Sequence, residues 1–442
     1  MDSTLAYIDQ GSFLGLRALG RVPILQFVWV YEHPVDLDGL RRFQQNLGYG
    51  LLGRLVERSP LPFGRHHWVS WRGPADVEVS GTVRPRDEVA AWADEQMRRP
   101  IDPEYGPPWR LAVQPLAGGR MAVSLATSHT TCDGLAFAHA ISDAVRGVTR
   151  DLGYPDPGSR ARGRALRQDT LQTVRAIPEI ARAVAAAARL ARNNRGDLDL
   201  SAARPAPPEV VDRGPSVIAP LVVAYIDEEL WSERAEGLGG SSNSLFAGVA
   251  AKVGQILGRV DEQGMVKLSL PVSERTEGDT RGNALSGVVL TIDPTDVGTS
   301  LRDVRAELKK NLAALSDTRL EIFGPLALTP FVPLPLARRL ERVALGSGAP
   351  IGCSNLGRLD PATNRPDGTD AEFIFGRQGD SHISAETLDR LGGMLFVVSF
   401  QVNGKVVITV SAWKCGGPNS ADQLARWVRS ALDEFGLAAT FE

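Results

Sequence analysis

The sequence predicts an α/β protein built from two similar halves. Residues 121–145 have the pattern of an apolar strand, a polar turn and a helix with apolar residues at helical spacing. A similar strand–helix order restarts after residue 216, and the stretch 193–215 between the halves carries four prolines. At 442 residues, the chain is long enough for two domains of ordinary size.

Composition places the chain among ordinary globular proteins, with 43% hydrophobic and 23% charged residues. A net charge of −3 gives no electrostatic reason to expect a nucleic-acid partner. Cys132, Cys353 and Cys415 lie far apart and without metal-ligand spacing, so we expect a reducing compartment, no disulfide framework and no metal site. No signal peptide is evident, and the apolar run 22–30 is too short to span a bilayer. We therefore expect a cytoplasmic protein without a transmembrane segment.

In the first half, the glycine-containing residues 1–20 are expected to lead into the first strand. Periodicity then predicts strands at 22–30, 66–69, 109–113 and 121–127, and helices at 36–52, 87–97 and 135–145. The spacing between the strands at 109 and 121 is that of a hairpin. The adjacent His66 and His67 would point to opposite faces of a strand, which makes them a poor metal site.

A basic helix is expected between the halves. Residues 151–165 are rich in Gly, Pro and Arg and are interpreted as a linker, whereas 168–193 is mostly helical with Pro178 interrupting it. Arg175, Arg182 and Arg189 recur every seven residues, opposite an apolar face. Such a helix could make peripheral contact with a lipid surface or an acidic carrier protein, or it could be a solvated face over the domain crossover.

In the second half, the patterns predict strands at 216–226, 265–271, 285–292, 371–377, 393–402 and 405–412, and helices at 241–257, 300–315 and 420–435. Asn403-Gly404 is a strong signal for a tight hairpin. Residues 326–345 are helical but broken by prolines, and they could line an apolar site or form ordinary core. The expected domains are an N-terminal lobe at 1–160, a crossover helix and Pro-rich linker at 161–215, and a C-terminal lobe at 216–442.

The pattern His129-x-x-x-Asp133-Gly134 lies where the strand at 121–127 ends. A histidine at a strand end is placed as a catalytic group would be, and imidazole titrates near neutrality, so it can accept a proton from a hydroxyl or amine. Gly134 is expected to permit a sharp turn that a Cβ would hinder. The alternative is a histidine that only closes a turn beside a core strand.

This pattern resembles the signature of the acyltransferase superfamily that includes chloramphenicol acetyltransferase, plant BAHD acyltransferases, wax ester synthases, polyketide-associated acyltransferases and nonribosomal peptide condensation domains. The resemblance implies two chloramphenicol-acetyltransferase-like lobes, each a mixed sheet with flanking helices, around a central tunnel. His129 would be the general base. Asp133 would be structural and paired with an arginine, for which Arg275 is a candidate.

Other segments resemble the same superfamily in the same order. Trp109 follows two prolines where wax ester synthases carry Pro-Leu-Trp, and it is interpreted as core or as a weak substrate contact. Asn243 matches the first residue of their Asn-Asp helix start. Arg275 ends a Pro-Val-x-x-Arg element that a Gly-Asn pair follows. Ser354-Asn355 resembles their Ser-Asn-x-Gly segment, whose side chains could donate to an oxyanion, although Ser-Asn-Gly is also a common turn.

The resemblance implies an acyltransferase that moves an acyl group from acyl-CoA or an acyl-carrier-protein thioester to a small-molecule alcohol or amine in lipid or natural-product biosynthesis. No tightly bound cofactor is expected, because acyl-CoA or a phosphopantetheinyl thioester is a co-substrate. Many relatives have a second histidine before the motif, and here Ser128 replaces it. One alternative is a free-standing condensation enzyme that joins carrier-bound aminoacyl groups. Another is a degenerate, non-enzymatic protein that docks a carrier.

Overall fold

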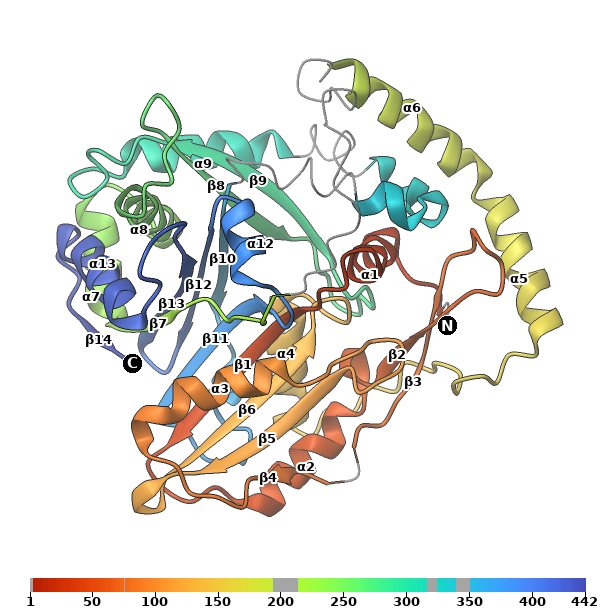
Figure 1. Cartoon of the computed structure of the whole chain (residues 1–442), viewed down its shortest axis with the longest axis horizontal. Helices are drawn as coiled ribbons and strands as arrows, with labels where there is room; N and C mark the ends of the chain where they lie inside the picture. Colours follow the sequence, from red (N-terminus) through yellow and green to blue (C-terminus); the bar gives the residue numbers. More distant parts are fainter. Residues whose placement is uncertain (1–2, 75, 194–213, 316–323, 339–349) are drawn as a thin grey trace.

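The structure, a computed structural model, describes residues 3–74, 76–193, 214–315, 324–338 and 350–442. These residues contain two large sheets flanked by helices and one two-stranded sheet (Figure 1). The two-lobed α/β architecture predicted from the sequence is confirmed. None of the helices in the described ranges combines the length and the hydropathy needed to cross a membrane.

The first sheet has the order β11-β1-β6-β5-β4. Its strands are β1 (Pro23–Tyr31), β4 (Glu78–Val79), β5 (Trp109–Pro115), β6 (Met121–Ser128) and β11 (Phe373–Asp380). β5 and β6 form the expected hairpin, with Trp109 opposite Thr127. β1 lies between β11 and β6 and pairs antiparallel with both, so Pro23 lies beside the end of β11 and next to the end of β6.

The second sheet has the order β14-β7-β13-β12-β10-β8-β9. Its strands are β7 (Leu221–Asp227), β8 (Val266–Ser273), β9 (Leu285–Ile292), β10 (Ile351–Arg358), β12 (Met394–Val402), β13 (Lys405–Trp413) and β14 (Ala439–Phe441). A small separate sheet pairs β2 (Arg54–Glu57) with β3 (His67–Ser70). The hairpin of β12 and β13 turns at Asn403-Gly404, where both residues have positive φ (47° and 72°), as this turn chemistry requires.

Helices cover both sheets. They are α1 (Tyr7–Leu19), α2 (Leu37–Leu47), α3 (Val89–Arg98), α4 (Gly134–Val145), α5 (Arg162–Arg175), α6 (Ile177–Asn193), α7 (Glu228–Gly237), α8 (Ser242–Ile256), α9 (Arg302–Ala313), α12 (Ala385–Arg390) and α13 (Ala421–Glu434). Short 3-10 helices occur at η1 (Gly50–Leu52), η2 (Arg86–Glu88), η3 (Ala117–Gly119), η4 (Gly324–Phe331) and η5 (Pro361–Asn364).

β11 is the point at which the sheets depart from the expected lobes. It comes from the range 216–442 but completes the first sheet (Figure 1). The fully buried Arg377 on β11 donates through Nε to Gln26 Oε1 (2.7 Å) on β1 and through Nη1 to Asp94 on α3. These charge-assisted hydrogen bonds stabilise the pairing of β11 with the first sheet. The division into domains at 1–160, 161–215 and 216–442 stays a prediction. By sequence β11 falls in the third range, but it pairs with the strands of the first.

Two helical segments differ from expectation. Residues 7–19 form a helix although they contain Gly11 and Gly15, because α1 packs against η4, where the Cβ position of Gly11 faces Thr329 at 3.8 Å. The segment 151–165, interpreted as linker, is partly helical, since α5 begins at Arg162. The proline-rich stretch 194–213 and the later part of 326–345 lie outside the described residues.

Candidate active site

The histidine turn joins the end of β6 to the start of α4. The His129 backbone N–H donates to the Pro23 carbonyl (2.8 Å), and the Thr131 N–H donates to the Ser128 carbonyl (2.9 Å), which closes the turn. His129 is half-buried, so part of its surface reaches solvent. The turn therefore places the partly exposed His129 at the end of β6, the middle strand of the first sheet.

Gly134 has a different role from the one expected. Its φ lies outside the left-handed region, so the turn itself does not demand a glycine. A Cβ at this position would lie 3.0 Å from Cδ2 of Leu356 on β10. The glycine therefore allows β10 of the second sheet to approach the start of α4.

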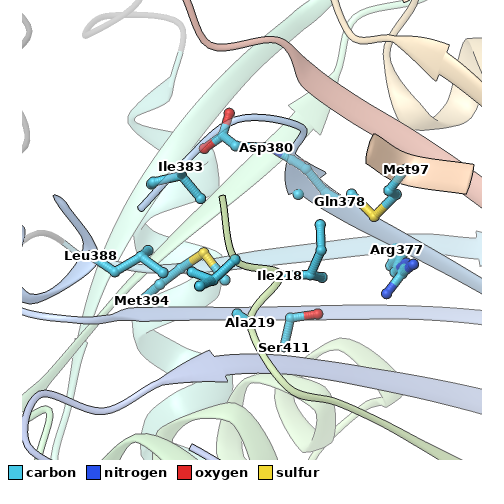
Figure 2. A pocket seen from close by; sticks show the side chains of 12 residues that line it. Met97, Ile218, Ala219, Arg377, Gln378, Asp380, Ile383, Leu388, Met394 and Ser411 are labelled. Atoms are coloured by element: carbon cyan, nitrogen blue, oxygen red, sulfur yellow. The ribbon is translucent and has the colours of Figure 1, made fainter. Parts of the chain in front are cut away.

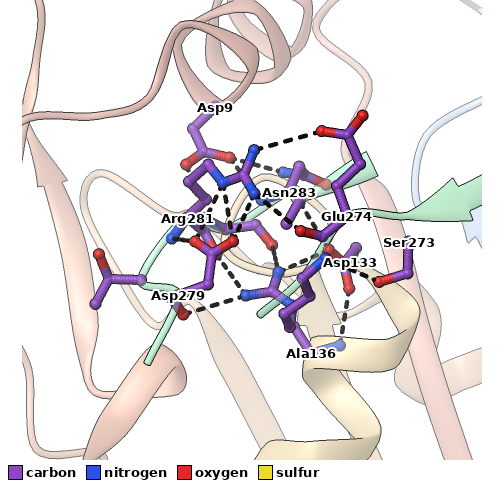
Figure 3. Close-up of polar contacts among 12 residues, drawn as sticks. Asp9, Asp133, Ala136, Ser273, Glu274, Asp279, Arg281 and Asn283 are labelled. Carbon is purple, nitrogen blue, oxygen red and sulfur yellow. Dashed lines mark hydrogen bonds and ion pairs between the residues drawn. The ribbon is translucent and has the colours of Figure 1, made fainter. Parts of the chain in front are cut away.

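Asp133 is a structural residue in this geometry. It is fully buried and caps α4, because its Oδ1 accepts from the Ala136 N–H (2.8 Å). Its Oδ2 accepts from Arg275 Nη2 (2.7 Å) and from the Ala284 N–H (2.9 Å). Arg275 was the candidate arginine partner, and the ion pair is present. Figure 3 shows how it joins the histidine turn to the β8–β9 loop.

Asn283, in the same loop, sets the tautomer of His129. Its Nδ2 donates to Asp9 Oδ1 (3.1 Å) and to the His129 carbonyl (3.1 Å), so its Oδ1 is the atom that faces His129 Nδ1 (3.1 Å). An amide oxygen only accepts hydrogen bonds. This assignment from the hydrogen-bond network therefore places the ring proton on Nδ1 and leaves the lone pair on Nε2.

Asp9, on α1, orients Asn283. It is fully buried and also accepts from the backbone N–H groups of Gly282 (2.8 Å) and Asn283 (2.7 Å) (Figure 3). Burial raises the pKa of Asp9, while the Arg54 guanidinium and these hydrogen bonds act in the opposite direction. Because every group bonded to Asp9 is a donor, we assign it as the carboxylate.

Asn243 and Asn355 lie together but in a separate cluster. Asn355 Nδ2 donates to Asn243 Oδ1 (2.7 Å), and Asn355 Oδ1 accepts from the Gly357 N–H (3.0 Å). None of the hydrogen bonds among the described residues joins Ser354 or Asn355 to His129. The link between the clusters is the Leu356 side chain, which lies against the start of α4. The oxyanion role of Ser354 and Asn355 stays a prediction.

Trp109 belongs to the core and not to a substrate surface. Its side chain has no exposed area, and its indole Nε1–H donates to the Leu52 carbonyl (2.9 Å). The edge of Trp71 packs on it at 5.4 Å between ring centroids. Of the two interpretations of Trp109, the structure favours core, because no atom of the indole is left to contact a ligand.

Asp9 and Arg54 were not predicted as parts of the site, and Asn283 was noted only within the Gly-Asn pair. Arg54 is fully buried, donates to the Thr131 carbonyl (2.8 Å) and the Thr280 carbonyl (2.7 Å), and stacks on Trp68 at 3.8 Å. No local pattern marks Asp9 or Arg54. Their roles depend on partners more than 70 residues away along the chain.

A small, partly open cavity lies between the lobes, beside the end of β11 (Figure 2). Met97, Ile218, Asp380 and Leu388 are among its lining residues, and its free volume is about 20 Å³. That is room for one water molecule and not for an acyl chain. The expected central tunnel therefore does not correspond to this cavity, and it stays a prediction.

No protein-family model matches the sequence, and no curated protein matches it. Solved structures do. A nonribosomal peptide synthetase, FmoA3, bound to alpha-methyl-L-serine-AMP, matches with a TM-score of 0.54 at 18% identity, over 99% of this chain but only 44% of that chain. The chain thus spans less than half of that synthetase.

Two further structures match over nearly their full length. The first condensation domain of the CDA synthetase has a TM-score of 0.54 at 16% identity, covering 100% of this chain and 99% of that one. Polyketide synthase associated protein 5 from Mycobacterium tuberculosis has a TM-score of 0.55 at 15% identity, covering 97% of both. These likenesses establish that the chain has the two-lobed fold of condensation domains.

Proposed function

We propose that this protein is an acyltransferase that moves an acyl group from a thioester to an alcohol or amine, with His129 as the general base. The observation that carries the proposal is the bond from His129 Nδ1–H to Asn283 Oδ1, which leaves Nε2 as the basic nitrogen of a partly exposed histidine. A base needs both a lone pair and access to its substrate. The hydrogen-bond network supports the first, and the partial exposure of His129 supports the second.

The chemistry needs one proton carrier. Nε2 of His129 takes the proton from the acceptor hydroxyl or amine while that oxygen or nitrogen forms a bond to the thioester carbonyl carbon. The tetrahedral intermediate then collapses, its C–S bond breaks, and the same proton passes from Nε2 to the departing thiolate. No covalent acyl-enzyme is required, so Ser128, whose side chain is buried within the turn, needs no catalytic role.

A modest set of groups suffices because a thioester is already activated. Proton transfer by a positioned base contributes about 10²–10⁴-fold. A single oxyanion donor contributes about 10²–10³-fold, and Ser354 and Asn355 are the candidates, since Leu356 brings their strand against the histidine turn. Asp133 and Arg275 hold the turn and take no part in proton transfer.

The donor is proposed to be acyl-CoA or an acyl-carrier-protein thioester. The structural likeness to condensation domains favours a second candidate, a free-standing condensation enzyme that accepts carrier-bound aminoacyl groups. Both use the same base and differ in the donor. A requirement for carrier-bound aminoacyl groups, with acyl-CoA ignored, would select the condensation enzyme.

The test is mass spectrometry of products formed from mixed acyl-CoA and acyl-carrier donors with pooled alcohol and amine acceptors. We expect ester or amide products from the wild-type protein and a loss of at least about 10²-fold for His129→Ala. The matched control is His139→Ala, since His139 is an exposed imidazole on α4 and should be dispensable.

Turnover by His129→Ala at the wild-type rate would refute the base assignment. Binding of a carrier without turnover across the donor panel would refute the acyltransferase and support the non-enzymatic alternative. Thermal unfolding of both variants checks that the fold is intact, so that lost turnover reports on the imidazole.

A further inference from the structure

The outer face of α5 and α6 is unusual among the described surfaces. The two helices contain 14 and 17 residues, follow each other with a break at Ala176, and form the outer rim of the molecule (Figure 1). At 1.5 Å per residue they extend over about 45 Å. Their inner face packs through small residues, since a Cβ on Gly324 of η4 would lie 2.9 Å from the Ala186 Cβ.

Large apolar side chains lie on the opposite, solvent-facing side. Leu171, Val174, Ile177 and Val184 each expose about half of their surface (49%, 53%, 55% and 53%), and Leu166 exposes 44%. Helical spacing places these residues away from the buried Ala165 and Ala183. A solvated crossover helix would carry polar residues here, so the apolar side chains need another explanation.

Arginines also lie on the exposed surface of both helices. Arg164, Arg167, Arg175, Arg182, Arg189 and Arg192 are all exposed, and none forms a salt bridge with a carboxylate in the described parts of the chain. The exposed acid on these helices is Glu179, which accepts a hydrogen bond from the Tyr7 hydroxyl (3.1 Å). The face therefore combines uncompensated positive charge with exposed apolar area.

We propose that the outer face of α5 and α6 docks the protein onto an anionic lipid surface. Arginine guanidinium groups pair with lipid phosphates, and apolar side chains between them insert into the boundary between headgroups and acyl chains. A lipid surface suits this face better than a folded acidic partner does. A protein partner requires complementary shape, whereas projecting helices present ridges that a fluid surface accommodates.

Packed elements connect α6 to the candidate site. The η4 helix lies between α6 and α1, and α1 carries Asp9, which holds Asn283 and through it His129. The exposed Phe331, at the end of η4, stacks on the exposed Phe63 with 5.9 Å between the ring centroids. The inference goes beyond the proposed function and does not depend on it.

The test is co-sedimentation of the full chain with vesicles of phosphatidylcholine alone or with about one third phosphatidylglycerol. We expect binding to the anionic vesicles only, and its loss at about 1 M salt, where charges are screened beyond about 3 Å. A triple variant Arg175→Gln, Arg182→Gln and Arg189→Gln should bind about 100-fold more weakly, at about fivefold per arginine. The charge-matched control replaces Arg390, Arg426 and Arg429 with Gln on α12 and α13 and should bind normally.

A second triple variant, Leu171→Gln, Val174→Gln and Ile177→Gln, tests the contribution of the exposed apolar side chains. Gln is at least as good a helix former as these residues, so α5 and α6 should persist while vesicle binding falls about tenfold or more.

Equal binding to neutral and anionic vesicles, or binding insensitive to both triple variants, would overturn the proposal. The proposal would also be overturned if the wild-type protein bound no vesicles while the arginine variant lost turnover with a carrier-bound donor. That result would assign the face to an acidic carrier. Turnover of soluble acyl-CoA should be unchanged in both variants, which keeps this test separate from that of His129.

Discussion

At the level of single side chains, two residues from distant parts of the sequence decide which nitrogen of His129 is basic. Asp9 accepts hydrogen bonds from Asn283, and this fixes the amide so that its oxygen faces the imidazole. If the amide were reversed, its NH₂ group would face Nδ1 and select the other tautomer, with the proton on Nε2. Asn283 is thus a positioning residue, and its effect should appear in the catalytic step.

We expect Asn283→Ala to lower kcat about 10–100-fold with little change in KM, because substrate binding survives while the correct tautomer is no longer enforced. Steady-state kinetics with a saturating donor measures both constants. Asp9→Asn should act in the same direction, since it removes the carboxylate that orients the amide.

The control for this prediction is Asn364→Ala, which removes another buried asparagine, one that donates to the Ala371 carbonyl (2.8 Å). That variant should lose stability and keep its kcat. Equal kcat values for Asn283→Ala and the wild-type protein would show that the amide has no influence on the base.

At the level of helices and strands, the site forms where ends of elements from both sheets meet. β6 and α4 supply the histidine turn, and the β8–β9 loop crosses to it through Arg275 and Asp133. The loop also accepts from the turn, because the Asp133 N–H donates to the Gly282 carbonyl (2.9 Å). β10 completes the junction with Leu356, whose side-chain end leaves no room for a large side chain at position 134.

We expect Gly134→Leu to destabilise the protein by about 1–3 kcal/mol, because the new side chain must push Leu356 and β10 away from α4. Gly134→Ala should be nearly neutral, since its Cβ meets only the mobile end of Leu356 and alanine is the better helix former. Adding Leu356→Ala to Gly134→Leu should restore more than half of the loss. Urea unfolding measures each free energy.

Gly163→Leu provides the matched comparison, because a Cβ on Gly163 in α5 would have no neighbour within 4 Å. It should be neutral or stabilising. If Gly134→Leu were equally harmless, the close approach of β10 to the histidine turn would be incorrect.

At the level of the whole molecule, the N-terminal residues are joined to the segment between β2 and β3 through His66. The Leu5 N–H donates to the His66 carbonyl (2.9 Å), the His66 ring packs edge-on against Phe13 of α1 (5.2 Å), and its Nδ1 accepts from the Ser59 N–H (3.3 Å). Burial lowers the pKa of His66 to about 4. This histidine therefore makes the stability of the molecule sensitive to acid.

The direction in which pH changes the free energy of unfolding follows from proton binding. An unfolded His66 has a pKa of about 6.5, so between about pH 6.5 and 4 the unfolded chain binds the proton that the folded chain excludes. We expect His66 to reduce the free energy of unfolding across that window by up to about 3 kcal/mol, with no contribution above it. The raised pKa of Asp9 acts in the opposite direction, because stability falls as pH rises through its window.

Urea unfolding of the wild-type protein and His66→Asn at several pH values separates these effects. Asparagine keeps an acceptor for the Ser59 N–H but does not titrate, so the slope of stability against pH between about 4 and 6.5 should decrease. An unchanged slope would contradict the assignment.

Local pattern was sufficient for much of the architecture. Strand β9 begins and ends at the residues expected from alternation, and the Asn403-Gly404 turn follows from the backbone preferences of those two residues. The motif at His129, with Arg275 as the candidate partner of Asp133, followed from a resemblance over well-separated segments. Such features are encoded within short windows or in residue types that one chemistry requires.

The remaining features depend on contacts between distant segments. The membership of β11 in the first sheet, the helix at 7–19 despite its glycines, and the roles of Asp9 and Arg54 could not be predicted, because their partners lie tens to hundreds of residues away. A buried carboxylate or guanidinium is stable only where several hydrogen bonds converge on it, and that convergence exists only once both lobes are folded. The residue types of the site can therefore be predicted from the sequence, whereas the tautomer of its histidine depends on contacts that form only in the folded structure.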